Sequence, residues 1–219
     1  MQRGARRCFR SEDWSALEKL SRGVIKSLDE VGETVSVAEW TSGGLISAAL
    51  WSAPDAHRCF RGAGVRLAYG INRDADREGV AQARDFARGK VGSGWPEGFE
   101  DTQLGRRESA RWGLVYEEGV AHSESGTAVH ALELAHAAKL NLGTEWGIGE
   151  SSVPGPKPHH RTGLLAGMGF VAVAGPTRET TGVLKVGPSD ASRSENMART
   201  ARAAIDLMAH LQSSRGPKA

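Results

Sequence analysis

The segment from Glu39 to Gly44 (EWTSGG) combines residue types that suit a binding turn. Its two adjacent glycines would let a ligand approach the backbone closely, and Thr41 and Ser42 would add hydroxyl groups. A short apolar run precedes the segment and a helical run follows it, so backbone N–H groups at the helix start would point toward an incoming anion. The same pattern is typical of a tight strand-to-helix turn whose hydroxyls cap the helix. On these residues alone both interpretations stay open.

The second candidate is the segment from Ser151 to Pro156 (SSVPGP), which follows a predicted strand. Ligands of open α/β proteins bind at the carboxyl ends of the strands, so this loop would lie at the appropriate edge of the sheet. A stiff, proline-rich connector between two elements would carry the same residues. We therefore expect a turn and a loop at one sheet edge, each with a structural alternative.

A third group, His130, Glu133 and His136, lies on a predicted helix and could suggest a metal site. Successive steps of three residues each rotate by about −60°, so the two histidines diverge by about 120° and do not share a face. Helices that bind zinc place two histidines at i and i+4 instead. We expect a solvated helix face here, with no metal and no cofactor. The pair His159–His160 stands beside prolines and is expected in a surface loop.

Apolar patterns of strand and helix period alternate along the chain. The predicted helices cover residues 11–29, 45–51, 123–142 (with Ser123 as its cap) and 192–211, and the predicted strands cover residues 34–38, 64–69, 146–150, 167–174 and 182–186. Strands interleaved with helices indicate an α/β protein. We predict a single three-layer domain, residues 11–212, with helices packed on a mixed β-sheet.

Three segments stand apart from this core. Residues 1–10 form a basic leader with four arginines and no acid, and residues 213–219 form a short tail; both are expected to be disordered. Residues 70–118 are interpreted as an irregular insertion. Its glycine-rich stretch 89–105 shows little apolar periodicity, so ordering it would cost backbone entropy with little burial to offset the cost.

The charge balance excludes some classes of function. The chain carries 28 basic and 26 acidic residues, and without the four leader arginines the balance is 24 to 26, a net charge of −2. A nearly neutral body offers no broad positive surface for nucleic acid. The longest uncharged stretches contain glycine and proline and are too short to span a bilayer, so no membrane partner is expected. Cys8 and Cys59 form no disulfide scaffold, which favours the cytoplasm, or an organelle if the leader is the remnant of a targeting peptide.

Together these motifs resemble the C-terminal domain family of CinA, the competence- and damage-inducible protein. Ala38 to Leu45 (AEWTSGGL) is similar to the family motif A-E-S-C-T-G-G-L, and Leu142 to Pro156 (LGTEWGIGESSVPGP) is similar to L-G-A-D-x-G-I-x-x-T-G-I-A-G-P. Weaker similarities are found at Phe60–Gly62, Val65–Tyr69, Gly167–Val173 and Arg193. The resemblance covers about Ser11 to Leu211, apart from residues 70–118.

Characterised members of this family deamidate nicotinamide mononucleotide, so the resemblance implies an amidohydrolase that acts on a nicotinamide nucleotide. The family's serine nucleophile falls at Trp40 and its lysine base at Asp74, and an indole cannot attack a carboxamide. The resemblance therefore implies an impaired enzyme in which Ser42 and Tyr69 are the candidate catalytic residues. The positions that it assigns to substrate binding are Glu39, Thr41, Gly43, Gly44, Ser151 and Gly155.

Two hypotheses about function follow. The first is a weakly active or inactive relative that keeps affinity for a nicotinamide nucleotide, or another phosphate-bearing small molecule, at the Glu39–Gly44 turn. The second is a non-catalytic binding or structural protein, as a homo-oligomer or in a larger protein assembly, recruited through the leader and the 70–118 insertion. The substitutions at Trp40 and Asp74 favour the second hypothesis for the chemistry.

Overall fold

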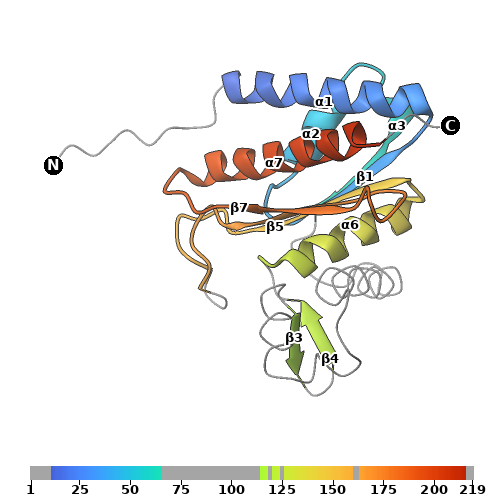
Figure 1. Ribbon diagram of the computed structural model, residues 1–219. Coiled ribbons are helices and arrows are strands. Elements are labelled where there is room, and N and C mark those ends of the chain that lie inside the picture. The colour runs from blue at the N-terminus through green and yellow to red at the C-terminus, as the bar shows by residue number, and fades with distance from the viewer. Residues whose placement is uncertain (1–10, 66–113, 118–119, 124–125, 160–162, 216–219) are drawn as a thin grey trace.

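The computed structural model describes residues 11–65, 114–117, 120–123, 126–159 and 163–215. In this part of the chain a five-stranded sheet runs in the order β2-β1-β5-β6-β7 (Figure 1). Its strands are β1 (Val35–Glu39), β2 (Phe60–Val65), β5 (Trp146–Ser152), β6 (Gly169–Ala174) and β7 (Gly182–Val186). Strands β2, β1 and β5 are parallel, whereas β6 and β7 run antiparallel to their neighbours. The sheet is therefore mixed, as predicted.

Helices cover both faces of this sheet (Figure 1). One face carries α1 (Ser11–Val31), α2 (Leu45–Trp51), α7 (Arg193–Ser213) and the short α3 (Ala56–Cys59), and the other face carries α6 (Ala128–Leu142). The larger core cluster lies between the sheet and the α1, α2 and α7 group, and it includes Leu28, Ile46, Ile148, Ile205 and Met208. The predicted three-layer arrangement is confirmed. In the described part of the chain no helix is long and apolar enough to cross a membrane.

Two glycines on β5 let α6 pack directly on the sheet. A Cβ atom at Gly147 or at Gly149 would lie within 2.2 Å of a backbone carbonyl oxygen of α6. Side chains alternate between the two faces along a strand. Ser151 therefore points toward α6, as the two glycines do, and Glu150 points to the opposite face. This alternation sorts the polar residues at the end of β5 into two separate environments.

Most predicted boundaries agree with the structure. The helices predicted at 11–29, 45–51 and 192–211 and the strands predicted at 34–38, 167–174 and 182–186 are present, each boundary within two residues. Strand β2 differs, since it begins at Phe60, four residues before the predicted start, and residues 66–69 lie outside the described residues. Gly62 and Gly64 lower the strand propensity of this segment, so pairing with β1 rather than local sequence sets its position.

The chain before α6 also differs from the prediction. β3 (Leu114–Glu117) pairs with β4 (Val120–Ser123) as a separate antiparallel two-stranded sheet, so Ser123 ends a strand and does not cap a helix. Helix α6 begins at Ala128, where the side chain of Thr127 accepts a hydrogen bond from the backbone N–H of His130. Two strands of four residues are too short for their alternation to stand out in the sequence. Of the predicted insertion 70–118, the stretch 89–105 lies outside the described residues.

The end of β5 is longer than predicted. Ser151 and Ser152 belong to the strand, because they pair with Phe170 and Gly169 of β6. The candidate loop therefore begins at Val153, and both serines are held in the sheet rather than in a connector.

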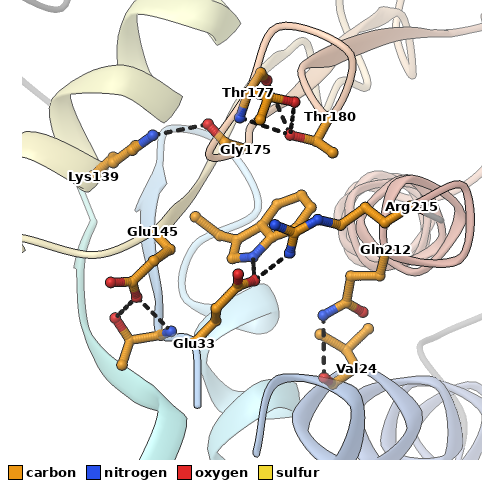
Figure 2. Close-up of polar contacts among 11 residues, drawn as sticks. Val24, Glu33, Lys139, Glu145, Gly175, Thr177, Thr180, Gln212 and Arg215 are labelled. Atoms are coloured by element: carbon orange, nitrogen blue, oxygen red, sulfur yellow. Dashed lines mark hydrogen bonds and ion pairs between the residues drawn. The ribbon is translucent and has the colours of Figure 1, made fainter. Parts of the chain in front are cut away.

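The opposite edge of the sheet, where β1 and β5 begin, is fastened by polar contacts between distant segments (Figure 2). The Glu33 carboxylate accepts a hydrogen bond from the Trp146 indole N–H at 2.7 Å and forms an ion pair with Arg215. The Arg215 guanidinium also lies over the Trp146 ring, 5.3 Å from its centroid. Glu145 accepts hydrogen bonds from the backbone N–H and hydroxyl of Thr34, which hold its pKa below the ordinary value. These contacts tie the segments before β1 and β5 to the end of α7.

Candidate functional site

Glu39 is the last residue of β1, and its fully buried carboxyl group caps the start of helix α2. Its Oε2 accepts hydrogen bonds from the backbone N–H groups of Gly44 at 2.8 Å and Ile46 at 3.2 Å. Its Oε1 accepts from the backbone N–H of Ser47 at 2.8 Å and from the Ser47 hydroxyl. Gly44 adopts a left-handed conformation with φ of 96°, which lets the chain fold back over this carboxylate. Glu39 therefore supplies the negative charge at the start of α2.

Glu150 reaches the same turn from the neighbouring strand. β1 and β5 are parallel and adjacent, so their carboxyl ends meet at one edge of the sheet. The Oε1 atom of Glu150 accepts hydrogen bonds from the backbone N–H groups of Trp40 at 2.7 Å, Ser42 at 2.6 Å and Thr41. Burial raises the pKa of Glu150, and the hydrogen bonds from Ser42 and Thr41 oppose that rise. The sequence analysis did not select Glu150, although its position at the end of a strand beside β1 is a usable signal.

These two carboxylates together occupy the backbone donors of the turn. The N–H groups of residues 40, 41 and 42 donate to Glu150, and those of residues 44, 46 and 47 donate to Glu39. The hypothesis of an anion site at Glu39–Gly44 relied on donors of this kind. In this structure they are bonded to side chains of the protein itself.

Ser42 lies between the two carboxylates. Its hydroxyl oxygen is 2.6 Å from Oε2 of Glu39 and 2.8 Å from Oε1 of Glu150, and the side chain is fully buried. Gly43 follows with φ of 66°, and a Cβ atom there would lie 2.7 Å from the terminal methyl group of Met197 on α7. The turn is thus packed against α7 as well as bonded to the sheet.

Trp40 is held by its backbone and by its ring. The backbone N–H donates to Glu150, and the ring meets the His130 imidazole edge-on with centroids 5.0 Å apart and an interplanar angle of 84°. The half-buried indole packs against a small cluster formed by Ala38, Leu134 and Ala138. The residue directly after Glu39 is therefore an aromatic side chain that belongs to the packing of α6.

Ser151 and His130 form a second buried pair on the α6 face. The Ser151 hydroxyl accepts a hydrogen bond from the Gly126 backbone N–H at 2.6 Å and lies 2.7 Å from Nδ1 of His130. A serine bonded to an imidazole is the pairing of a nucleophile and a general base. Both side chains are buried, however: Ser151 is fully buried, and the exposed fraction of His130 is 2%.

The expectation of a solvated face at His130, Glu133 and His136 is wrong. The exposed fraction of Glu133 is 7%, and both ring nitrogens of His136 are buried with no hydrogen-bond partner in the described part of the chain. Burial, aided by the nearby Lys139 charge, lowers the pKa of His136 to about 4. The helix is buried on most sides because it packs closely on β5, an arrangement that helical periodicity alone does not reveal. Among the described residues no three side chains are grouped to hold a metal ion.

The loop after β5 is fastened to the start of α7. Asn196 donates to the Pro154 carbonyl at 3.1 Å, and the Arg193 guanidinium donates to the Gly155 carbonyl at 3.0 Å. Ser192 and Glu195 form a capping box that fixes this end of α7. His159 lies half-buried in the following loop, and His160, Tyr69 and Asp74 lie outside the described residues.

The site residues that were predicted from the sequence therefore lie in two groups. Thr41 lies with Glu39 and Glu150, where its hydroxyl oxygen is 2.8 Å from Oε2 of Glu150 and also contacts the Ser152 hydroxyl. Ser151 lies on the α6 side with His130. In the described part of the chain, a cavity of about 210 Å³ lies between α1 and the start of α7. None of the predicted site residues lines it; its lining includes Asp13, Glu195, Arg199 and Arg202.

The sheet order, the three layers and the glycine turn between β1 and α2 define a mixed α/β domain. The family model for the CinA C-terminal domain matches residues 17–75, a region that includes β1, the turn, α2 and β2. Over these residues the chain is similar to the CinA family, as the sequence motifs indicate. A comparison with curated proteins gives no match.

Solved structures of the CinA superfamily share the fold. The competence/damage-inducible protein CihA from Agrobacterium tumefaciens is 21% identical with a TM-score of 0.57, over 90% of this chain and 95% of that one. A CinA superfamily protein from Klebsiella pneumoniae 700603 is 15% identical with a TM-score of 0.60, over 91% and 99% of the two chains. One from Escherichia coli is 18% identical with a TM-score of 0.57, over 97% of each chain. At these identities the similarity establishes the fold.

Proposed function

We propose that this chain is a CinA-like domain that does not hydrolyse the carboxamide of a nicotinamide nucleotide, and that it serves as a non-catalytic binding or structural protein. The observation that carries the proposal is the environment of Trp40. Its backbone is bonded to Glu150 and its ring is packed on His130, at the position where the family resemblance places a serine nucleophile. No hydroxyl can be presented to a substrate from that side chain.

The burial of Ser42 supports the same conclusion. Attack on a carboxamide requires the nucleophilic oxygen to come within about 3.5 Å of the substrate carbon. The Ser42 side chain is fully buried, and its hydroxyl is enclosed by two carboxylates. A substrate would have to displace Glu39 or Glu150 and break the backbone hydrogen bonds that each one accepts.

A residual amidohydrolase is the second candidate function, and one observation favours it. The Ser42 hydroxyl lies 2.6 Å from the Glu39 carboxylate, which is the distance between a nucleophile and a general base. In this version the Ser42 oxygen attacks the carboxamide carbon while its proton passes to Glu39, ammonia leaves with that proton, and water then hydrolyses the resulting ester. Tyr69 is the second candidate catalytic residue that the family resemblance implies. An activity measurement separates the two candidates.

The test is ammonia release from nicotinamide mononucleotide by the purified full-length protein, beside an active CinA-family deamidase as the positive control. We expect no release above the buffer, because loss of a nucleophile and its base typically lowers turnover on the order of a millionfold. Ser42→Ala and Ser151→Ala are the matched variants. Release that Ser42→Ala abolishes would establish the residual amidohydrolase, and release that only Ser151→Ala abolishes would assign it to the Ser151–His130 pair. Either result overturns the proposal.

A further inference from the structure

We propose that, of the two buried acids Glu39 and Glu150, Glu150 is a neutral carboxylic acid in the folded protein at neutral pH. The two side chains are joined through a single hydroxyl group, that of Ser42. The proposal concerns the charge carried by the turn and does not depend on any ligand or turnover.

The short distance between two buried acids carries the first step. The Ser42 oxygen is 2.6 Å from an oxygen of Glu39 and 2.8 Å from an oxygen of Glu150. A hydroxyl group has one proton and can donate it to one of these oxygens at a time. With both groups ionised, two buried negative charges would face each other across this one hydroxyl group.

Among the residues that the structure describes, no cation compensates for two charges here. Neither Glu39 nor Glu150 forms an ion pair in the described part of the chain, and both are fully buried. The charged groups on the packed elements are engaged elsewhere: on α7, Arg193 and Arg199 donate to Gly155 and Asn196, and on α6, which also carries Glu133, His130 is bonded to Ser151. Strand β6 places the apolar Val171 opposite Glu150.

The pattern of donors decides which group is neutral. Both oxygens of Glu39 accept backbone N–H groups, from Ser47 on one side and from Gly44 and Ile46 on the other. All backbone donors to Glu150 converge on Oε1. In the described residues, its Oε2 meets only the hydroxyl groups of Thr41 and Ser152. A hydroxyl can accept as well as donate, whereas an N–H can only donate, so a proton fits on Oε2 of Glu150 and on neither oxygen of Glu39.

A chain of hydroxyl groups can receive the proton's hydrogen bond. Thr41 contacts Ser152, and the Ser152 hydroxyl lies 3.3 Å from that of Thr200 on α7. The Thr200 hydroxyl donates to the backbone carbonyl of Asn196 at 3.0 Å. With Oε2 of Glu150 protonated, each hydroxyl accepts from the preceding group and donates to the next, and the chain ends on a carbonyl. Burial, which raises the pKa of Glu150, acts in the same direction.

Two isosteric variants test the assignment. In Glu150→Gln the amide oxygen can keep the three N–H donors while the NH₂ group donates to the hydroxyls of Thr41 and Ser152, as a neutral acid would. In Glu39→Gln the NH₂ group must face backbone N–H donors whichever way the amide is turned. We expect urea midpoints close to wild type for Glu150→Gln and strongly lowered for Glu39→Gln. Equal losses in the two variants, or the reverse order, would overturn the proposal.

A pH series supplies a readout that a merely structural role would not move. A buried acid with a raised pKa binds its proton in the folded state and releases it in the unfolded state, so its contribution to stability falls as pH rises above the ordinary Glu pKa. The unfolding constant of wild type, divided by that of Glu150→Gln, should therefore rise tenfold per pH unit in that window. A constant ratio would contradict the proposal. The infrared carbonyl band of a neutral carboxylic acid, present in wild type at pH 7 and lost in Glu150→Gln, tests the proton directly; its absence from wild type overturns the assignment even if the variant does not fold.

Discussion

At the scale of one residue, Trp40 fixes the Glu39–Gly44 turn to the rest of the fold. Its indole is shared between the end of β1 and helix α6, and its backbone N–H is one of three that converge on a single oxygen of Glu150. A buried carboxyl group that accepts several backbone hydrogen bonds is strongly fixed. The side chain and the backbone at position 40 therefore hold the turn closed, and neither presents a reactive group.

His136 provides a prediction at the residue scale. Its pKa is lowered to about 4 by burial, while in the unfolded chain it titrates near 6.5. The unfolded state therefore binds the proton first as the pH falls, and the free energy of unfolding decreases between pH 6.5 and about 4, on the order of 3 kcal/mol in total. His136→Phe should remove this part of the acid sensitivity. Urea unfolding of both proteins at several pH values measures it, and parallel curves would show that His136 is accessible to protons in the folded state.

At the scale of elements, the contact between α6 and β5 depends on two small positions. Gly149 has no room for a side chain, because a Cβ atom there would lie 2.2 Å from the Ala131 carbonyl oxygen. Any substitution must push α6 away from the sheet and disturb both His130 and Trp40. The close packing of α6 on β5 therefore requires glycine at position 149.

We predict that Gly149→Ala lowers the free energy of unfolding by about 1–3 kcal/mol, the usual cost of overpacking a core. Gly23→Ala is the matched control, because Gly23 lies within α1 and a Cβ atom there would have no neighbour within 4 Å. The control should be neutral or more stable by up to about 1 kcal/mol, since alanine favours a helix. Urea denaturation of the three proteins gives the comparison, and an equal effect at both positions would contradict this account of the interface.

The sequence predicts elements whose signal is local. The amphipathic spacing of α1, the run Leu45–Trp51 and the left-handed end of α6 at Gly143 all agree with the structure. It fails where pairing between strands decides, as in the early start of β2 and the β3–β4 pair.

The candidate site also combines residues that are contiguous in sequence with residues that only the fold brings together. Glu39, Ser42 and the two glycines could be found in one motif, because they are contiguous in sequence. Glu150 could not be assigned to that turn from spacing, since its hydrogen bond to the Ser42 backbone joins positions 108 residues apart. The burial of His130 depends likewise on the sheet that α6 covers. The sequence motif therefore predicts the turn, but it does not predict which groups accept hydrogen bonds from the backbone N–H groups of that turn.

At the scale of the whole molecule, the two edges of the sheet are both closed by the protein's own polar groups. One end of the strands is fastened by Glu33, Trp146 and Arg215, and the other by Glu39 and Glu150. Figure 2 shows Glu33 beside Arg215 at the first of these ends. The second edge is where open α/β proteins bind their ligands. In this chain it is filled by two glutamate side chains, one from each of two adjacent parallel strands.

The central claim, that the turn is closed to ligands, is tested most directly by a backbone amide NMR titration of the ¹⁵N-labelled full-length protein. Nicotinamide mononucleotide and, separately, inorganic phosphate are added to millimolar concentration while the amides of residues 40, 41, 42, 44, 46 and 47 are followed. The account predicts that these six signals do not move and stay protected from hydrogen exchange, because their N–H groups remain bonded to Glu39 and Glu150. Saturable shifts in these six amides, with loss of their protection, would contradict it.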